Sequence, residues 1–362
     1  MLLGRCRCPS SLYSIRTHHL PDRVLNPLGH GSFGTVVKAE DTYTSSVVAI
    51  KLLHRDELLH NDVNTERKIY RKLVEGCDPR VEYFAHVHGT GVHDGFSCTV
   101  FELCYSTLYN VVKGYSGLVP LPSRHVMEIA YQLISAVAYL HSLGIAHTDI
   151  KLDNIALKYG DTVNVQWLDP TTGFQEKKLL VSTHICVLDL GNAVEVSVNT
   201  GNYGRIGARS YRAPEVTLGL PWSFGVDSFG VGCVIAEVYL QHNVISMDIE
   251  TDREQLATID ALVGPFPEAY ARLIEEKVPG TFVFGDVVSV KYPGEGKNPT
   301  DRIHTSALRR LSQVRPLSAY IHNPLLHDLV HKLMCPDPRA RMNMEHGLRH
   351  RYFDGLRSMQ LQ

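Results

Sequence analysis

The sequence lacks the features that would place its 362 residues outside the ordinary globular proteins. No apolar run is long enough to span a bilayer, and the apolar start MLL is too short for a secretory signal. Neither sign of charge dominates, because 36 Lys and Arg nearly balance 38 Asp and Glu and leave a net charge of −2. This balance argues against a chain that binds nucleic acid or an anionic membrane through its overall charge.

Cysteines at metal-ligand spacing are also missing. The eight cysteines are scattered and form no C-x-x-C pair, so the sequence argues against a zinc site. Cys98, Cys186 and Cys233 lie in apolar runs, where buried free thiols are common, and this pattern suits a reducing compartment. The 19 histidines are dispersed as well, and His86 and His88 have no further ligand at metal spacing.

What is present is a change of pattern along the chain. Three β-branched runs, RVLNPLG, TVVKAED and SVVAIKLL, are separated by turn residues and predict strands. DVNTERKIYRKLVEG, residues 62–76, has apolar positions at helical spacing and predicts one helix. SRHVMEIAYQLISAVAYLHSLG then predicts a long amphipathic helix with a serine near its start and Gly144 at its end. Further helices are expected near 227–240, 253–263, 266–276 and 324–334.

We therefore predict an α+β chain of two lobes. Residues of about 24–102 form a small β-rich lobe with one main helix, and residues of about 103–353 form a larger, mostly helical lobe. Residues 1–23 are expected to be a short disordered lead-in, and residues 354–362 a tail.

Two stretches do not fit this division and are interpreted as insertions. Residues 158–184 contain TVNVQWLD and KKLLVSTHICVLD, which suggest a hairpin. Residues 264–323 include a part rich in Gly, Pro and basic residues, 280–323, which we expect to be irregular. The basic residues of 309–315 are expected on a solvated helix face.

A glycine-rich segment follows the first predicted strand. LGHGSFGTV contains Gly29, Gly31 and Gly34 in the pattern G-x-G-x-x-G, which dinucleotide-binding turns share. A dinucleotide turn leads from a strand into a helix, whereas strand-like residues lie on both sides here. The segment is therefore interpreted as a hairpin whose backbone can approach phosphates because no Cβ intervenes, although an ordinary turn fits this motif alone equally well.

A lysine ends the apolar strand VVAIK. Lys51 would be costly to bury without a carboxylate partner. Glu66 lies beside the apolar stripe of the following helix and is the favoured partner, with Asp62 and Glu57 as weaker candidates. The alternative is that Glu66 is solvated and that Lys51 only extends its ammonium group to water.

IAHTDIKLDNIAL, residues 145–157, concentrates the residue types that position a phosphate acceptor. Asp149 is suited to accept a hydroxyl proton, Lys151 to neutralise a transferring phosphoryl group, and Asn154 to offer an oxygen to magnesium. VLDLGN supplies Asp189 as a second metal ligand after an apolar strand. Each residue alone fits a surface loop, but their common order and spacing make a chance match remote.

With these segments in order, the chain from about Val24 to Phe353 resembles the eukaryotic protein kinase family. The resemblance implies the bilobed kinase fold, with ATP between the lobes and two Mg²⁺ ions at its phosphates. Lys51 would then hold the α- and β-phosphates and Glu66 would anchor Lys51. Asp149 would be the base, and Asn154 and Asp189 would bind metal. The implied ATP-binding positions are Leu28, Gly29, Gly31, Gly34, Val36, Ala49, Lys51, Phe101, Glu102, Cys104 and Ala156.

Other motifs of the family follow in the second lobe. Ala213-Pro214-Glu215 resembles the end of the activation segment, and Arg341 in DPRARM resembles the buried partner of Glu215. Asp227 matches the acid that braces the catalytic loop from below.

Within the family, HTDIK, VFELCYSTLYNVV, YRAPEVTLGLPWSFGVD and the insertion at 264–323 resemble the Clk/LAMMER kinases of the CMGC group. DLGNA is closer to the SR-protein kinases, and REQLATIDALVGPFP departs from the LAMMER signature. The resemblance implies a serine/threonine kinase, with dual specificity left open, acting on Arg/Ser-rich splicing proteins. It further implies a nuclear or cytoplasmic monomer without direct contact to nucleic acid or membrane.

Four departures from the family pattern concern details of the site. Leu190 replaces the usual Phe, Ala156 a larger aliphatic residue, and Leu152 the usual proline. Thr148 stands where arginine commonly pairs with an activation-loop phosphate, so activity should not depend on such a pair there. If it did, Arg209 or Arg212 would have to bind the phosphate.

Two alternative functions follow from these departures and relatives. A pseudokinase scaffold would have lost catalysis, although every expected metal and phosphate ligand is retained. A proline-directed kinase of the DYRK type would keep catalysis and change the substrate. Against this alternative, the activation segment contains no Tyr-x-Tyr.

Overall fold

The computed structural model describes residues 23–31, 34–42, 44–53, 62–93, 96–169, 173–197, 201–292 and 302–359. The expected lead-in up to residue 22 and the candidate Glu57 lie outside the described residues, as do the last three residues of the expected tail.

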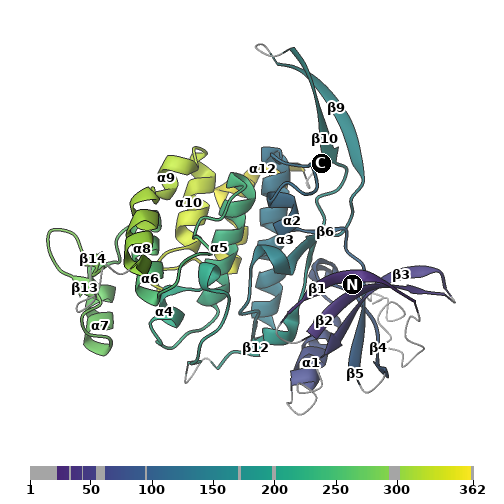
Figure 1. The fold of residues 1–362 in the computed structure, drawn as a ribbon, viewed down its shortest axis with the longest axis horizontal. Coiled ribbons are helices and arrows are strands. Elements are labelled where there is room, and N and C mark those ends of the chain that lie inside the picture. The colour runs from purple at the N-terminus through teal and green to yellow at the C-terminus, as the bar shows by residue number, and fades with distance from the viewer. Residues whose placement is uncertain are drawn as a thin grey trace, which may run out of the picture.

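The first lobe is built on a five-stranded antiparallel sheet in the order β1-β2-β3-β5-β4 (Figure 1). In β2 and β3, buried positions are interspersed with partly buried ones, as in a half-buried sheet, whereas β1 is exposed along its whole length. Its one long helix is α1, Asp62–Glu75, and the short 3₁₀ turn η2, Pro79–Tyr83, leads back to the sheet. The strands are β1 Arg23–His30, β2 Gly34–Asp41, β3 Ser46–Leu53, β4 Val87–His93 and β5 Phe96–Glu102.

The second lobe packs around α3, Ser123–Ser142, and α5, Gly225–Leu240. α5 is buried without interruption from Val226 to Val238, so the polar residues Asp227 and Glu237 lie inside the core. The other helices are α2 Leu108–Val112, α4 Pro214–Thr217, α6 Asp252–Val263, α7 Glu268–Lys277, α8 Arg302–Gln313, α9 Leu317–Tyr320, α10 Pro324–Leu333, α11 Met344–Leu348 and α12 Asp354–Met359.

The predicted bilobed α+β architecture is confirmed, and so are the four helices expected in the second lobe. The long helix expected with a serine near its start and Gly144 at its end is confirmed as α3. Ser123 is the first residue of α3, Pro122 precedes it at the cap position, and no side chain caps this end.

Short strands between the lobes hold the loop at residues 147–154. β7, Ile145–Ala146, pairs with β12, Val194–Glu195, and β8, Ile155–Leu157, pairs with β11, Ile185–Val187, and with β6, Ser106–Thr107. The loop is thereby fixed at both ends by strand pairing. Four 3₁₀ turns complete this lobe: η3 Leu152–Asn154, η4 Leu190–Asn192, η5 Arg209–Tyr211 and η6 Arg351–Phe353.

The stretch at residues 158–184 contains a hairpin of two eight-residue strands, β9 Thr162–Asp169 and β10 Gly173–Leu180. Figure 1 shows this hairpin projecting from the body of the molecule near the boundary between the lobes.

The expectation of an irregular stretch at 280–323 is wrong in part. The described residues of this stretch include α8 and the short pair β13 Phe282–Val283 and β14 Ser289–Val290. Arg309 and Arg315 are exposed, as expected, but Arg310 on α8 is only partly solvated, because its Nε and Nη2 lie 2.7 and 3.1 Å from the carboxylate of the buried Glu254. This long-range ion pair fixes α8 against α6 and left no local signal in the sequence.

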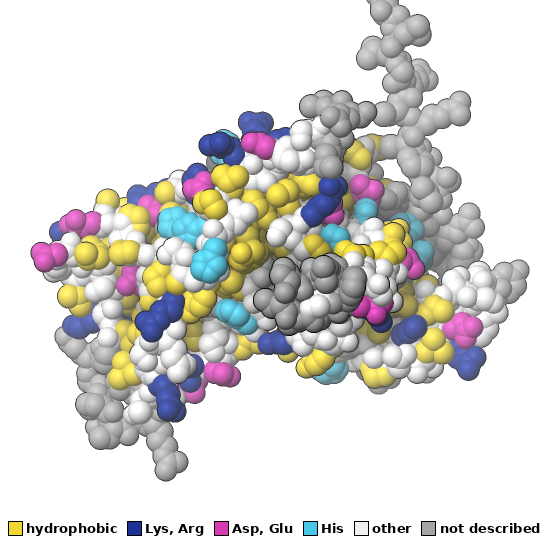
Figure 2. Space-filling model, turned by 90° about the horizontal axis from the view of Figure 1, so that it is seen from above, with side chains coloured by type: hydrophobic (Ala, Val, Ile, Leu, Met, Phe, Trp, Pro, Cys, Tyr) yellow, Lys and Arg dark blue, Asp and Glu magenta, His cyan; other side chains and the backbone are white. Residues whose placement is uncertain are grey.

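Basic and acidic side chains are interspersed over the face seen from above in Figure 2. That face therefore carries no large field of one sign, in line with the small net charge. Among the described residues, no helix has the length and apolar character that a membrane span requires.

Candidate active site

Lys51 on β3 lies between two carboxylates. Its Nζ is 3.0 Å from Oε1 of Glu66 on α1 and 2.7 Å from Oδ1 of Asp189 after β11. Burial alone would lower the pKa of Lys51, but the two carboxylates outweigh it and the pKa is raised. Burial likewise opposes the charge on Asp189, yet Lys51 holds the pKa of that carboxyl below its usual value. The sequence's favoured partner, Glu66, is thus the one that reaches Lys51.

Asp149, Lys151 and Asn154 form a second polar group on the loop between β7 and β8. Lys151 Nζ lies 2.6 Å from Oδ2 of Asp149, and Asn154 Nδ2 donates to the same oxygen at 3.0 Å and to the Asp149 carbonyl at 2.8 Å. Oδ1 of Asp149 accepts the backbone N–H of Ala208 at 3.2 Å. The Asp149 carboxylate is thereby held in one orientation, with a cation beside it.

A buried carboxylate below this loop fixes its backbone. Asp227 accepts the backbone N–H of His147 at 2.7 Å and that of Thr148 at 2.8 Å, and it also contacts His141 Nε2 at 2.9 Å. Burial disfavours the charged form, but His141 and these N–H donors hold the pKa of Asp227 below its usual value. The expected bracing role of Asp227 is confirmed.

Thr148 adopts a backbone conformation that β-branched residues rarely take, with φ of 70°. Its hydroxyl donates to the Asn192 carbonyl at 2.7 Å. Together with Asp227, this bond compensates the strain and ties the loop to the segment that follows Asp189.

The three glycines of the first hairpin have different reasons to be glycine. A Cβ on Gly29 or Gly31 would meet nothing within 4 Å, so their backbone faces open space. A Cβ on Gly34 would lie 2.0 Å from the Leu52 carbonyl oxygen, so only glycine fits between β2 and β3. Strand packing therefore explains Gly34, whereas the protein itself gives no steric reason for glycine at positions 29 and 31.

The expected adenine-binding residues lie on both sides of the connection between the lobes. Phe101 is buried at the end of β5, and its ring lies 5.6 Å from that of Tyr70 on α1. Ala156 on β8 is 1% exposed, whereas Leu28 on β1 is 48% exposed. The remaining expected positions are Val36 on β2 and Ala49 on β3, each partly buried, Glu102 as the last residue of β5, and Cys104 in the connection that follows.

The Glu102 side chain joins two other segments of the chain, and the sequence did not reveal this role. Its carboxylate lies 2.9 Å from Lys158 Nζ and accepts the backbone N–H of His86 at 2.9 Å. The resemblance had assigned Glu102 only through its backbone, and a partner 56 residues away leaves no local pattern.

Comparison with known families matches residues 23–353 to the protein kinase domain. The chain belongs to the protein kinase family. A crystal structure of another kinase domain has the same fold, with a TM-score of 0.77 at 22% identity, over 91% of this chain and 94% of that one.

The most similar relatives include kinases of the CLK type. The chain is 26% identical to the probable dual specificity protein kinase madd-3 of Caenorhabditis elegans, covering 98% of this chain and 40% of that one. It is 28% identical to the probable serine/threonine-protein kinase clkA of Dictyostelium discoideum, over 91% and 35% of the two chains. The human dual specificity protein kinase CLK1 is 27% identical, over 92% and 66%. The chain thus spans between about a third and two thirds of these relatives.

The activation segment of the kinase is held from below by a closed ion pair. Arg341 contacts both oxygens of Glu215, at 2.6 and 2.8 Å, and the two side chains are 0% and 1% exposed. The expected pairing of Arg341 with Glu215 is confirmed.

The arginines of this segment are also engaged. Arg205 and Arg209 pair with Asp252 at the start of α6, and Arg212 donates to the carbonyls of Ile206 and Gly207. Any phosphate bound by Arg209 or Arg212 would have to replace these contacts.

Gln255 on α6 was not identified from the sequence. Its Nε2 donates to the carbonyls of Arg209 and Arg212 at 2.7 and 2.8 Å, and its Oε1 accepts the Thr217 hydroxyl at 2.6 Å. This buried amide fixes the end of the activation segment, and nothing local in its helix distinguishes it from a surface glutamine.

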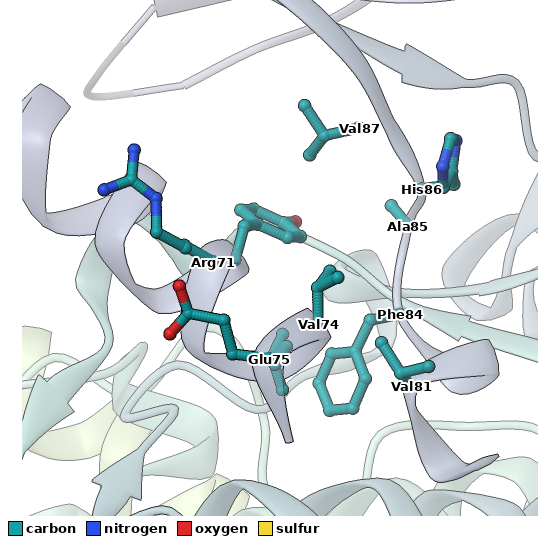
Figure 3. Close-up of a pocket in the computed structure, with 10 residues that line it drawn as sticks. Arg71, Val74, Glu75, Val81, Phe84, Ala85, His86 and Val87 are labelled. Atoms are coloured by element: carbon teal, nitrogen blue, oxygen red, sulfur yellow. The ribbon is translucent and has the colours of Figure 1, made fainter. Parts of the chain in front are cut away.

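A cavity of about 320 Å³ lies behind α1. Figure 3 shows Val74 of α1 with Val81, Phe84 and Val87 around it, while the side chains of Arg71 and Glu75, which also line the cavity, extend away from Val81 and Phe84. Tyr70 also lines the cavity, and its buried hydroxyl has no hydrogen-bond partner. The helix that carries Glu66 is therefore less tightly packed on this side than on the side of Lys51.

Asn154 and Asp189, the residues expected to hold a metal, suit a cation that a bound ligand also coordinates. Among the described residues, no three His, Cys, Asp or Glu side chains come together as a metal site. Asn154 donates through its amide nitrogen to Asp149, which leaves its oxygen available, and Asp189 supplies a carboxylate whose side chain is 32% exposed. Two oxygen donors of this kind suit a divalent ion that completes its shell with phosphates and water.

Proposed function

We propose that this chain transfers the γ-phosphoryl group of ATP to serine and threonine hydroxyls of proteins, with Mg²⁺ as the divalent ion. The observation that carries the proposal is the arrangement of Asp149, whose carboxylate is fixed by Asn154 and Ala208 and accompanied by Lys151. A fixed carboxylate beside a cation is suited to orient a hydroxyl and to accept its proton.

Each residue of the site has a distinct part in this mechanism. Lys51 would contact the α- and β-phosphates, since Glu66 already holds its ammonium group in place. Asp149 would align the acceptor oxygen, and Lys151 would stabilise negative charge that develops on the transferred group. The metal, held by Asn154 and Asp189, would supply charge neutralisation at the phosphates.

We further propose Arg/Ser-rich splicing proteins as substrates and the nucleus or cytoplasm as the place of action. The support is the likeness of HTDIK, of the 264–323 insertion and of the whole domain to CLK-type kinases. The names of the relatives also support tyrosine as a further acceptor to be tested.

The assay that tests the proposal measures phosphate incorporation from Mg-ATP into an Arg/Ser peptide. Asp149→Asn should lose nearly all incorporation, since an amide cannot accept the proton. Asp153→Asn is the matched control, because Asp153 lies on the same loop, is exposed, and should change the rate by less than about threefold. Equal incorporation by Asp149→Asn and by the natural chain would contradict the assignment.

The two alternatives predict different results. A pseudokinase would show no incorporation in the natural chain, and a scaffold that does not bind nucleotide would show no thermal stabilisation by Mg-ATP. A proline-directed kinase would prefer proline over arginine beside the acceptor on a peptide array. The fixed Asp149 favours the active kinase over the scaffold.

A further inference from the structure

The hairpin of β9 and β10 has two outer edges. In the part of the chain that the structure describes, these strands pair only with each other, from Thr162 opposite Leu180 to Asp169 opposite Gly173. Each outer edge therefore presents backbone N–H and C=O groups that no neighbouring strand uses. Such a row of groups is a template for the addition of another strand.

The β10 edge carries the devices that prevent strand addition. Glu176, Lys177 and Lys178 place three consecutive charges on this strand, and Lys177 also donates to the Pro120 carbonyl of the large lobe. Charges on an edge strand make the approach of another strand unfavourable.

The β9 edge lacks these devices. The sequence from Thr162 to Leu168 contains no charge and no proline, and its pairing with β10 has no bulge. Every residue from Asp161 to Gln166 is exposed, including Val163 at 49% and Val165 at 37%. An uncharged, β-branched edge of this length is an association site.

We propose that the β9 edge pairs with the β9 edge of a second copy of this chain, antiparallel and centred on Asn164. The two hairpins would then form one four-stranded sheet across a two-fold axis. Val163 of each copy would face Val165 of the other, Thr162 would face Gln166, and the two Asn164 side chains would meet on the axis.

The alternation of side chains and the end charges select this register. If the two-fold axis passes through a β9 residue, the faces that carry Val163 and Val165 lie on the same side of the joined sheet. If it passes between two residues, each valine lies opposite a polar residue of the other copy. An axis through Val165 would bring Asp161 opposite Asp169 twice, which like-charge repulsion disfavours. An axis through Asn164 keeps the valine pairs and avoids the carboxylate pairs.

A single seam between two strands is smaller than the about 1,600 Å² of a standard stable interface. We therefore expect a reversible dimer with a dissociation constant in the micromolar range and a monomer in dilute solution.

Sedimentation measured over a concentration series tests the proposal. It is applied to two variants that carry opposite charges at positions 162 and 166, which face each other across the axis. The basic variant carries Thr162→Lys and Gln166→Lys, and within the hairpin Gln166 faces Glu176, so the added charge is tolerated there. The acidic variant carries Thr162→Glu, Gln166→Glu and Glu176→Lys for the same reason. Each variant alone should dimerise about tenfold more weakly than the natural chain, and an equimolar mixture should recover the natural affinity.

Two controls keep these outcomes interpretable. Lys178→Glu, on the β10 edge, should leave the dimer unchanged. The unfolding temperature and its increase with Mg-ATP should match the natural chain in every variant, because β9 lies outside the active site. The proposal is overturned if the natural chain is monomeric throughout the series, if either variant dimerises like the natural chain, or if the mixture fails to recover.

Discussion

Two buried ion pairs in this kinase use the same chemistry in different surroundings. Glu215 and Arg341 are closed on all sides, and the remaining guanidinium donors end on the carbonyls of Gly225, Cys335 and Pro336. Lys51 and Glu66 are also buried, but the ammonium has a second partner, Asp189, whose side chain is 32% exposed. The first pair has no room for a ligand, whereas the second can exchange a contact with one.

A third buried carboxylate, Glu237 on α5, extends the comparison because its hydrogen-bond donors are neutral. It accepts the Tyr211 hydroxyl at 2.6 Å, the Asn243 amide at 3.2 Å and the Val244 N–H at 3.1 Å. Burial raises the pKa of Glu237 to about 7, and these donors lower it only in part. A paired carboxylate and an unpaired one therefore respond differently to substitution and to pH.

The largest expected effect is the loss of stability when the ion pair of Glu215 and Arg341 is broken. Arg341→Met leaves Glu215 buried without a cation and should lower the free energy of unfolding by about 3–5 kcal/mol. Denaturant unfolding measures it, with Arg315→Met as control, because Arg315 is exposed and should show no measurable loss. A loss below about 1 kcal/mol for Arg341→Met would mean that the pair is not closed.

The next effect is a pH dependence of opposite sign to that of a paired carboxylate. The folded pKa of Glu237 lies above the usual 4.5, so the folded state binds this proton more tightly than the unfolded state. Stability should therefore fall as pH rises from 4.5 to about 7, by on the order of 3 kcal/mol. Unfolding of Glu237→Gln, measured against the natural chain from about pH 5 to about pH 8, should lack this component; parallel curves would contradict it.

Substitution of Lys51, which pairs with Glu66, should weaken the binding of Mg-ATP. Lys51→Met removes the phosphate contact, so the stabilisation of about 2.7 kcal/mol expected from Mg-ATP at a hundredfold of its dissociation constant should disappear. Thermal unfolding with and without Mg-ATP measures it. Lys68→Met is the control, since Lys68 is an exposed lysine on α1 and should keep the full shift.

The smallest expected effect concerns Thr148. Thr148→Val keeps the β-branched shape but removes the donor to the Asn192 carbonyl, which should cost about 1 kcal/mol of stability. Phosphatase treatment of the natural chain should change the rate at which it phosphorylates a substrate by less than about twofold. The reason is that position 148 has no arginine to pair with an activation-loop phosphate. A complete loss on dephosphorylation would redirect attention to Arg209 and Arg212.

The sequence anticipated the elements and residues that follow local rules. Strand alternation and helical spacing predicted the lobes, and motif spacing predicted that Glu66 would reach Lys51, which lies 15 residues away. Glu102 with Lys158 and Arg310 with Glu254 were missed, because each pair joins residues 56 positions apart without a repeating pattern.

The missed residues share a physical reason. The buried Tyr70 hydroxyl and the Gln255 amide depend on what the fold brings next to them, and their own segments look like ordinary amphipathic helices. Tertiary contacts decide such roles, so one sequence without its structure does not reveal them.

The position of Gly34 has a mechanical consequence. Its missing side chain lets β2 approach the Leu52 carbonyl, one residue beyond Lys51, and Val36 pairs directly with Lys51. The second half of the glycine hairpin and the lysine ammonium are therefore parts of one rigid body. Because β1 in turn pairs with β2 as far as His30 opposite Thr35, a movement of the hairpin would carry β3 and Lys51 with it.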